Sequence, residues 1–186
     1  MALMESNMLA LGTAAPNFLL PDTVSGQDKS YASISDGKKA TVVMFICNHC
    51  PYVIHVNPEI KRLSDEYLQK DVAFVAISSN DVEKYPQDGP EEMKLFAQSN
   101  GFHFPYLYDE SQNVALAYDA ACTPDFYVFD EDDALVYRGR LDGSRPGNQN
   151  ALDGSDLRAA LDAVLAGERP SETQYPSAGC SLKWKP

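Results

Sequence analysis

Residues 41–51 read TVVMFICNHCP, an apolar run that ends in two cysteines with two residues between them. The run 40–46 shows no polar alternation, which is typical of a strand in a parallel sheet that is covered on both faces. Pro51 follows the second cysteine, and apolar residues then recur at spacings of three and four, which indicates a helix. The sequence therefore predicts a C-x-x-C motif at a strand-to-helix junction, the arrangement of a redox-active dithiol.

A helix start favours a thiolate at this motif. Backbone N–H groups there carry roughly half a positive elementary charge, and such sites lower a cysteine pKa from about 8.5 into the range of about 3.5–7.5. We expect Cys47 to be the attacking thiolate and Cys50 to resolve the mixed disulfide. His49, just before the second cysteine, is expected to stabilise the Cys47 thiolate and to make the disulfide a better oxidant.

Metal binding and simple packing are the alternatives for these cysteines. Cys47, His49 and Cys50 offer three ligands within four residues, whereas a structural zinc site uses four, usually as two spaced pairs. No second pair follows at a suitable distance, because Cys122 and Cys180 are single and distant in the sequence. The dithiol interpretation is therefore preferred, and no metal or other cofactor is expected.

The composition is that of a soluble globular domain. The chain has 186 residues, of which 44% are hydrophobic and 23% charged, enough for one domain with its own core. The net charge of −12 argues against nucleic acid and anionic membranes as partners. No stretch approaches the roughly 20 apolar residues of a membrane helix, and four cysteines are too few for a disulfide scaffold. We expect a cytoplasmic protein.

The rest of the chain alternates strands and helices. Residues 12–20 are expected to be an extended entry segment. Later elements are predicted as strands at 72–78 and about 104–108, helices at 91–99, 111–118 and 153–165, and a hairpin of 125–129 and 134–138. This order predicts an α/β three-layer sandwich. It is expected to form a single domain over 1–186, with a core of about 12–166 and an irregular tail at 167–186.

The chain resembles the thioredoxin-like proteins grouped near alkyl hydroperoxide reductase and thiol-specific antioxidant proteins, in a peroxiredoxin-like subgroup. The resemblance spans about Gly12 to Trp184. It rests on five blocks of sequence, which are Gly12–Phe18, Phe45–Val53, Ala121–Asp130, Tyr137–Asp142 and Gly179–Trp184. It implies a thioredoxin-like fold and thiol redox chemistry.

Thr123 and Pro124 directly precede the predicted hairpin, where the thioredoxin-like fold holds a cis-proline. An X–Pro bond tolerates the cis form far better than other peptide bonds do. We expect a cis bond that faces the dithiol and presents the Thr123 backbone to a substrate strand. Cys122 and Cys180 are candidate third redox thiols. Cys122 has a buried, inert thiol as its alternative, and Cys180 takes part if the tail folds back over the site.

The chain departs from true peroxiredoxins at two positions of their Pro-x-x-x-Thr-x-x-Cys motif. Cys50 stands at the peroxidatic cysteine, but Cys47 replaces the threonine and Val43 the proline. Weak or no peroxidase turnover is therefore expected. The tryptophan and the buried aspartate of thioredoxin correspond to Ile46 and Thr41, so proton transfer to Cys50 must use another group or water.

The expected function is that of a thiol–disulfide oxidoreductase. The Cys47/Cys50 dithiol would exchange with a protein or small-molecule disulfide and be recycled by a thioredoxin- or glutathione-type system. A thiol peroxidase is the rival enzyme, and a metal- or partner-binding module on the same fold is the rival without catalysis. A reversible Cys47–Cys50 disulfide, a sulfenic acid and stoichiometric zinc distinguish the three.

Overall fold

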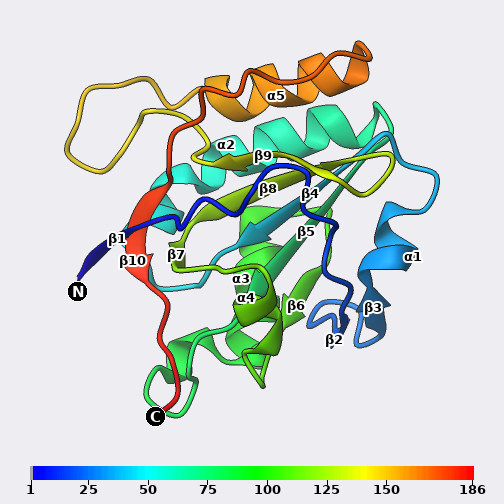
Figure 1. The fold of residues 1–186 in the computed structure, drawn as a ribbon. Helices are drawn as coiled ribbons and strands as arrows, with labels where there is room; N and C mark the ends of the chain where they lie inside the picture. The colour runs from blue at the N-terminus through cyan, green and yellow to red at the C-terminus, as the bar shows by residue number, and fades with distance from the viewer. Residues whose placement is uncertain (1) are drawn as a thin grey trace.

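A five-stranded sheet forms the middle layer of the computed structural model, which describes residues 2–186 (Figure 1). Its order is β6-β5-β4-β8-β9. The strands are β4 (Ala40–Phe45), β5 (Val72–Ser78), β6 (Tyr106–Tyr108), β8 (Asp125–Asp130) and β9 (Leu135–Gly139). The strands β4, β5 and β6 run parallel, whereas β8 and β9 form an antiparallel hairpin beside β4. The predicted strands and hairpin are confirmed.

Helices cover both faces of this sheet. They are α1 (Tyr31–Ser35), α2 (Pro51–Leu68), α3 (Pro90–Asn100), α4 (Asn113–Ala117) and α5 (Ser155–Leu165), with a 3-10 turn η1 (Pro86–Asp88). Within residues 2–186, no helix is long and apolar enough to cross a bilayer. The short α1 and η1 were not predicted, because three to five residues are too few to show a helical period.

The side chains of β4 alternate between two cores, as those of a strand must. Val42 and Met44 pack with α2, α3 and α5 in one core, and Val43 and Phe45 pack with α1 and α4 in the other. All four side chains are buried. The strand is therefore covered on both faces, which confirms the predicted α/β three-layer sandwich.

A second, three-stranded sheet lies beside the C-x-x-C motif. It joins β1 (Leu3–Glu5), β10 (Ala178–Ser181) and β7 (Cys122–Thr123), with β10 in the middle. Figure 1 shows β10 in red between the blue N-terminal strand and β7. The prediction of an irregular tail is wrong for these four residues. They form a strand because both of their edges find partners, although glycine and serine are poor strand formers. A separate hairpin of β2 (Leu19–Pro21) and β3 (Asp28–Ser30) lies in the N-terminal segment.

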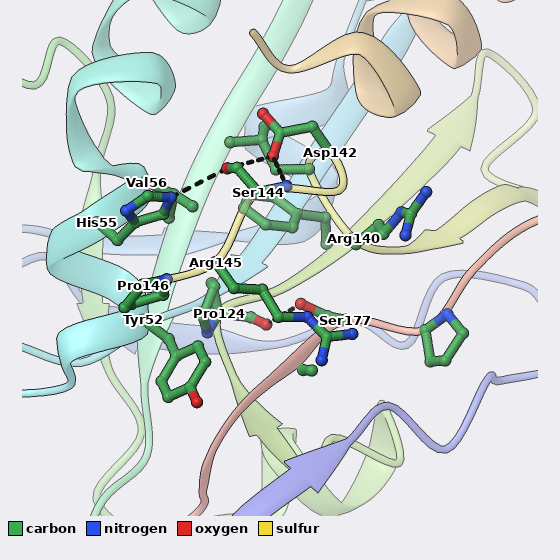
Figure 2. Close-up of a pocket in the computed structure, with 14 residues that line it drawn as sticks. Tyr52, His55, Val56, Pro124, Arg140, Asp142, Ser144, Arg145, Pro146 and Ser177 are labelled. Carbon is green, nitrogen blue, oxygen red and sulfur yellow. Dashed lines mark hydrogen bonds between the residues drawn. The ribbon is translucent and has the colours of Figure 1, made fainter. Parts of the chain in front are cut away.

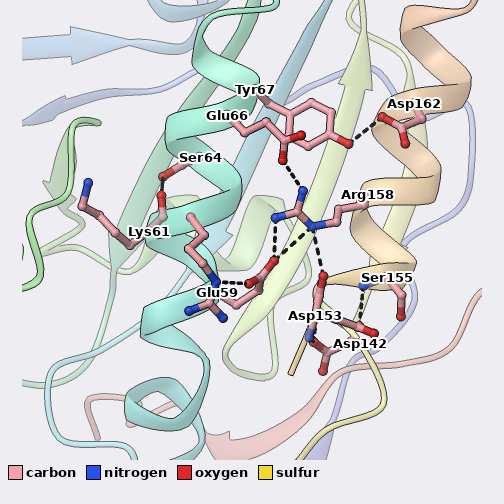
Figure 3. A network of polar contacts seen from close by, with 12 residues as sticks. Glu59, Lys61, Ser64, Glu66, Tyr67, Asp142, Asp153, Ser155, Arg158 and Asp162 are labelled. Carbon is pink, nitrogen blue, oxygen red and sulfur yellow. Dashed lines mark hydrogen bonds and ion pairs between the residues drawn. The ribbon is translucent and has the colours of Figure 1, made fainter. Parts of the chain in front are cut away.

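A buried carboxylate ties α5 to α2 (Figure 3). The Glu59 side chain is 3% exposed. The Arg158 guanidinium from α5 donates to Glu59 Oε1 from Nη2 at 2.7 Å and from Nε at 3.0 Å. Arg62, which lies on α2 like Glu59, donates to Glu59 Oε2 at 2.7 Å. Arg158 also pairs with Glu66, so one arginine bridges two turns of α2.

Replacing Arg158 with alanine should lower the free energy of unfolding by about 3 kcal/mol, because the buried Glu59 carboxylate loses two of its three charged hydrogen bonds. Arg62→Ala is the matched control. Its side chain is 57% exposed and Arg158 still donates twice to Glu59 in this variant, so the loss should be about 1 kcal/mol or less. Urea unfolding followed by circular dichroism measures both variants. Equal losses would show that Arg158 is no more important to the α2–α5 contact than a surface arginine.

Candidate active site

The dithiol lies where β4 passes into α2, as predicted. Cys47 follows the strand by two residues, and Cys50 is the N-cap residue of α2. The helix begins at Pro51, since proline has its φ preset for the first helical position and lacks the N–H that would go unpaired there. Cys47 is 1% exposed and Cys50 is 0% exposed. Neither sulfur is open to a protein substrate in this conformation.

The Thr123–Pro124 peptide bond is cis, which confirms the prediction, and Thr123 contacts both sulfurs. Cys47 Sγ lies 3.5 Å from Thr123 Oγ1. Cys50 Sγ lies 3.5 Å from the carbonyl oxygen of Thr123, which accepts its proton when Cys50 is a thiol. The hairpin thus brings a hydroxyl and a carbonyl group against a dithiol that lies 76 and 73 residues away in sequence.

The backbone edge of Thr123 is not open to a substrate strand. The strand β10 pairs there in antiparallel fashion, with Cys180 opposite Thr123. Gly179 makes this approach sterically feasible. A Cβ atom at Gly179 would lie 1.9 Å from the Thr123 carbonyl oxygen and 3.2 Å from Pro124 Cδ. The tail therefore folds back over the site and carries Cys180 with it.

Contacts within the pair shift the pKa values of its two thiols in opposite directions. A hydrogen bond from the Cys47 thiol, helped by the thiol and N–H of Cys180 and the N–H of Val53, lowers the pKa of Cys50 to about 5 against the opposing effect of burial. The same contact, burial and the Asp88 carboxylate raise the pKa of Cys47. The sequence argument expected the helix start to stabilise the thiolate of Cys47. The first turn of α2 follows Cys50 directly, so its free N–H groups reach that sulfur instead.

His49 faces Asp88 rather than the thiols. Its Nδ1 lies 2.7 Å from Asp88 Oδ2, out of line for a hydrogen bond, and its ring stacks on Tyr85 at a centroid distance of 5.5 Å. The buried Asp88 carboxylate also accepts the N–H of Asn48 at 2.8 Å and the Asn80 side chain at 2.9 Å. The His49 ring also comes within 4.8 Å of Cys47 Sγ, and the expected effect of His49 on the thiolate stays a prediction.

Cys47, His49 and Asp88 could together hold a metal ion. Their ligand atoms all lie within 4.8 Å of one another, and they form the only such group found in residues 2–186. Sulfur, nitrogen and carboxylate oxygen are all ligands that zinc accepts. Cys50 lies outside the group, so the ligand set considered from the sequence, with both cysteines and His49, is not assembled here.

Cys122 lies away from the exchanging sulfurs. Its Sγ is 3.9 Å from the carbonyl oxygens of both Pro124 and Ser177, and burial raises the pKa of this thiol. A protonated, enclosed thiol is a poor nucleophile. The surroundings of Cys122 therefore support the inert alternative.

A narrow cleft lies beside the cis-proline (Figure 2). It is lined by residues of α2, of the hairpin and of the loop at 142–146, among them Tyr52, Pro124, Arg145 and Ser177. Figure 2 shows the Arg145 side chain beside Ser177 and Pro124. The cleft reaches the proline, and the segment 176–178 that leads into β10 forms its border.

Three polar side chains in this cleft resemble a hydrolytic triad in composition but not in arrangement. His55 Nε2 lies 3.0 Å from Ser144 Oγ. The Ser144 hydroxyl donates to Asp142 Oδ1 at 2.5 Å, so its proton is not directed at the histidine. Asp142 also accepts the N–H groups of Asp153 and Gly154. The group therefore holds the loop before α5, and sequence reasoning did not single it out.

A dithiol at a strand-to-helix junction, opposite a cis-proline in a five-stranded α/β sandwich, defines a thioredoxin-like redox protein. The chain belongs to the Redoxin family, whose pattern it matches over residues 10–161.

Three relatives agree with this assignment. A solved structure of an uncharacterized conserved protein from Geobacillus kaustophilus is 55% identical, with a TM-score of 0.98 over 100% of this chain and 98% of that one. A hypothetical protein from Sinorhizobium meliloti 1021 is 44% identical, with a TM-score of 0.94 over 97% and 98%. The thiol-disulfide oxidoreductase ResA of Halalkalibacterium halodurans is 24% identical over 132 residues, 71% of this chain and 69% of ResA. The Redoxin family and the similarity to ResA support a thiol redox function.

The Asp88→Asn substitution should lower the pKa of Cys47, because it removes a negative charge that disfavours the thiolate. The pKa is best measured in a Cys50→Ser background, by ultraviolet thiolate absorbance against pH, since Cys47 is then the only thiol of the pair. His49→Ala should raise the pKa of Cys47, since Asp88 then loses the ring that lies beside its carboxylate. Asp109→Asn removes another buried carboxylate and serves as control. An unchanged Cys47 pKa in Asp88→Asn would exclude the coupling.

The stability of the protein should fall as pH rises from about 4 to about 7, in part because of Asp125. Burial raises the pKa of this carboxyl to about 7, although Ser6 and Tyr127 donate to it. An unfolded aspartate has a pKa of about 3.9, so the folded state binds the extra proton in this window and is stabilised at its acidic end. Asp125→Asn should remove up to about 1.4 kcal/mol per pH unit from the slope. Urea unfolding at several pH values tests this, and parallel curves for both proteins would refute it.

Proposed function

We propose that the protein is a thiol–disulfide oxidoreductase that works through Cys47 and Cys50. The observation that carries the proposal is the contact of these two sulfurs at the start of α2, against the cis-proline loop. The substrate is a protein or small-molecule disulfide, and the thiols themselves carry the electrons. A thioredoxin- or glutathione-type system in a reducing cytoplasm restores the dithiol.

The charge distribution sets the order of the steps. The Cys50 thiolate attacks one sulfur of the substrate disulfide, and the second sulfur leaves as a thiolate that takes up a proton. Cys47 then gives up its proton and attacks Cys50 Sγ, which releases the first substrate sulfur. The products are a Cys47–Cys50 disulfide and two substrate thiols, so two electrons have passed to the substrate. The same steps in reverse oxidise a dithiol substrate.

Thiol peroxidase activity is the second candidate, because Cys50 occupies the peroxidatic position and has a lowered pKa. A peroxidatic site also needs donors that polarise the O–O bond. The Cys47 thiol, a weak donor, stands where peroxiredoxins have a threonine hydroxyl. We therefore expect slow peroxide turnover compared with disulfide exchange.

Trapping of reaction intermediates tests the proposal. The wild-type protein, treated with oxidised glutathione and then alkylated, should show a Cys47–Cys50 disulfide that dithiothreitol reverses. Cys47→Ser should form a mixed disulfide on Cys50, because Cys50 is then the only thiol of the pair that can attack. Cys50→Ser should react more slowly, since the raised pKa of Cys47 leaves little thiolate.

Each outcome of this experiment has a distinct meaning. Absence of the wild-type disulfide and of mixed disulfides in both variants would overturn the exchange function. Trapping on Cys47 alone would keep the function and reverse the order of attack. Sulfenic acid that forms with hydrogen peroxide faster than any disulfide exchange would favour the peroxidase, and stoichiometric zinc in the purified protein would favour the metal-binding alternative.

A further inference from the structure

The strand β10 takes the place of a substrate strand. Extended peptides bind many proteins by adding a strand to an open sheet edge, and the edge nearest the dithiol is that of β7. In this structure Cys180 pairs with Thr123 and Ser181 with Cys122 along that edge. The chain thus fills its own docking position.

Gly179 fits this position by its size rather than by its backbone angles. The residue does not have a positive φ, so conformational freedom does not require glycine here. Any side chain would collide with the backbone of Thr123 and with the Pro124 ring. The segment is therefore shaped to lie directly on the cis-proline.

The Cys180 thiol lies where the attacked sulfur of a substrate would lie. Cys180 pairs with Thr123, whose carbonyl oxygen contacts Cys50 Sγ, and it lies in the same buried cluster as both cysteines of the dithiol. Its thiol lies beside the Cys50 thiol and the N–H of Tyr52, at the start of α2. The backbone N–H of Cys180 faces Cys50 Sγ in turn. Cys180 is 4% exposed, so its sulfur is directed into the site and not into solvent.

We propose that β10 is an internal substrate mimic and that Cys180 is a third redox-active thiol, which forms a disulfide with Cys50. The proposal rests on the proposed exchange function. In the oxidised protein, the Cys180 thiolate attacks Cys50 Sγ, the Cys47–Cys50 bond breaks, and Cys47 leaves as the thiolate that takes up the proton from Cys180. No electrons enter or leave, and the disulfide moves from one partner of Cys50 to the other.

The anchoring of β10 makes this arrangement the resting state. Before the strand, the Ser177 hydroxyl donates to the carbonyl oxygen of Pro124. After it, the carbonyl oxygen of Lys183 accepts the N–H of Asp81 at 2.8 Å and the Gln112 side chain at 2.9 Å. A protein substrate must therefore displace β10 by local opening, and a Cys50–Cys180 disulfide would lock the strand in place.

Disulfide mapping tests the third thiol. Cys47→Ser retains Cys50 and Cys180. With oxidised glutathione it should pass through the mixed disulfide on Cys50 to an intrachain Cys50–Cys180 bond, with release of two glutathione thiols per chain. The Cys47→Ser, Cys180→Ser double variant should stop at the mixed disulfide, whereas Cys47→Ser, Cys122→Ser should behave as Cys47→Ser. A stable mixed disulfide in Cys47→Ser, with Cys180 still free to alkylate after denaturation, would overturn the proposal.

Alkylation kinetics test the displacement of the strand. Gly179→Ala should increase the rate at which iodoacetamide modifies Cys50 by about tenfold or more, equivalent to about 1.4 kcal/mol in the opening equilibrium. Ser181→Ala on the same strand is the control and should leave the rate within about twofold. Circular dichroism confirms that each variant is folded. Native-state hydrogen exchange of the wild-type protein is an independent measurement, in which β10 amides should exchange before those of β4. Equal protection of both strands would contradict the local opening of β10.

The two proposals fail in different ways. Absence of the wild-type Cys47–Cys50 disulfide, together with absence of mixed disulfides in both Cys47→Ser and Cys50→Ser, refutes the exchange function. Presence of that disulfide, together with no Cys50–Cys180 bond in Cys47→Ser and an unchanged alkylation rate in Gly179→Ala, refutes only the substrate mimic.

Discussion

The first N–H groups of α2 have no partners within the helix, and the active end of the molecule is arranged around them. Pro51 removes one of these donors, and the carbonyl oxygen of Cys50 accepts from Val53 and Ile54. The sulfurs of Cys50 and Cys180 take further N–H contacts, from Val53 and from Tyr52. A buried helix end needs such partners, and thiolates can serve because the field there favours negative charge. The reactivity of the site thus follows from the hydrogen-bonding requirement of a helix start.

The two carboxylates near the site have opposite surroundings. Asp88 accepts hydrogen bonds from two amide groups and lies beside the His49 ring, and it acts on Cys47 through its charge. Asp125 follows the cis-proline and lies in the sheet core with only a few donors, so that burial dominates its pKa. One therefore modulates the thiols electrostatically, while the other links the hairpin to Ser6 and the N-terminal segment.

The sequence predicted those parts of the site that depend on local pattern. The apolar run 40–46 marked β4, and Pro51 marked the start of α2, which located the cysteines. The position of Pro124 before a hairpin pointed to the cis bond. Asp88 could not be foreseen, because it meets Asn48 only through the loop after β5, 40 residues away. The strand at 178–181 has no strand-forming residues of its own, and its pairing is set by edges far away in the chain.

The middle position of β10 also has a consequence for the order in which the protein is made. Its partners β1 and β7 precede it in the chain by about 175 and 58 residues, as their registers show. Both strands therefore leave the ribosome as unpaired edges, which invite pairing with other chains. The dithiol is complete in sequence from residue 50 onward, yet β10 can cover it only after residues 178–181 have emerged. The nascent chain thus passes through an interval in which its cysteines are accessible to chaperones, oxidants and thiol reagents that the finished fold excludes.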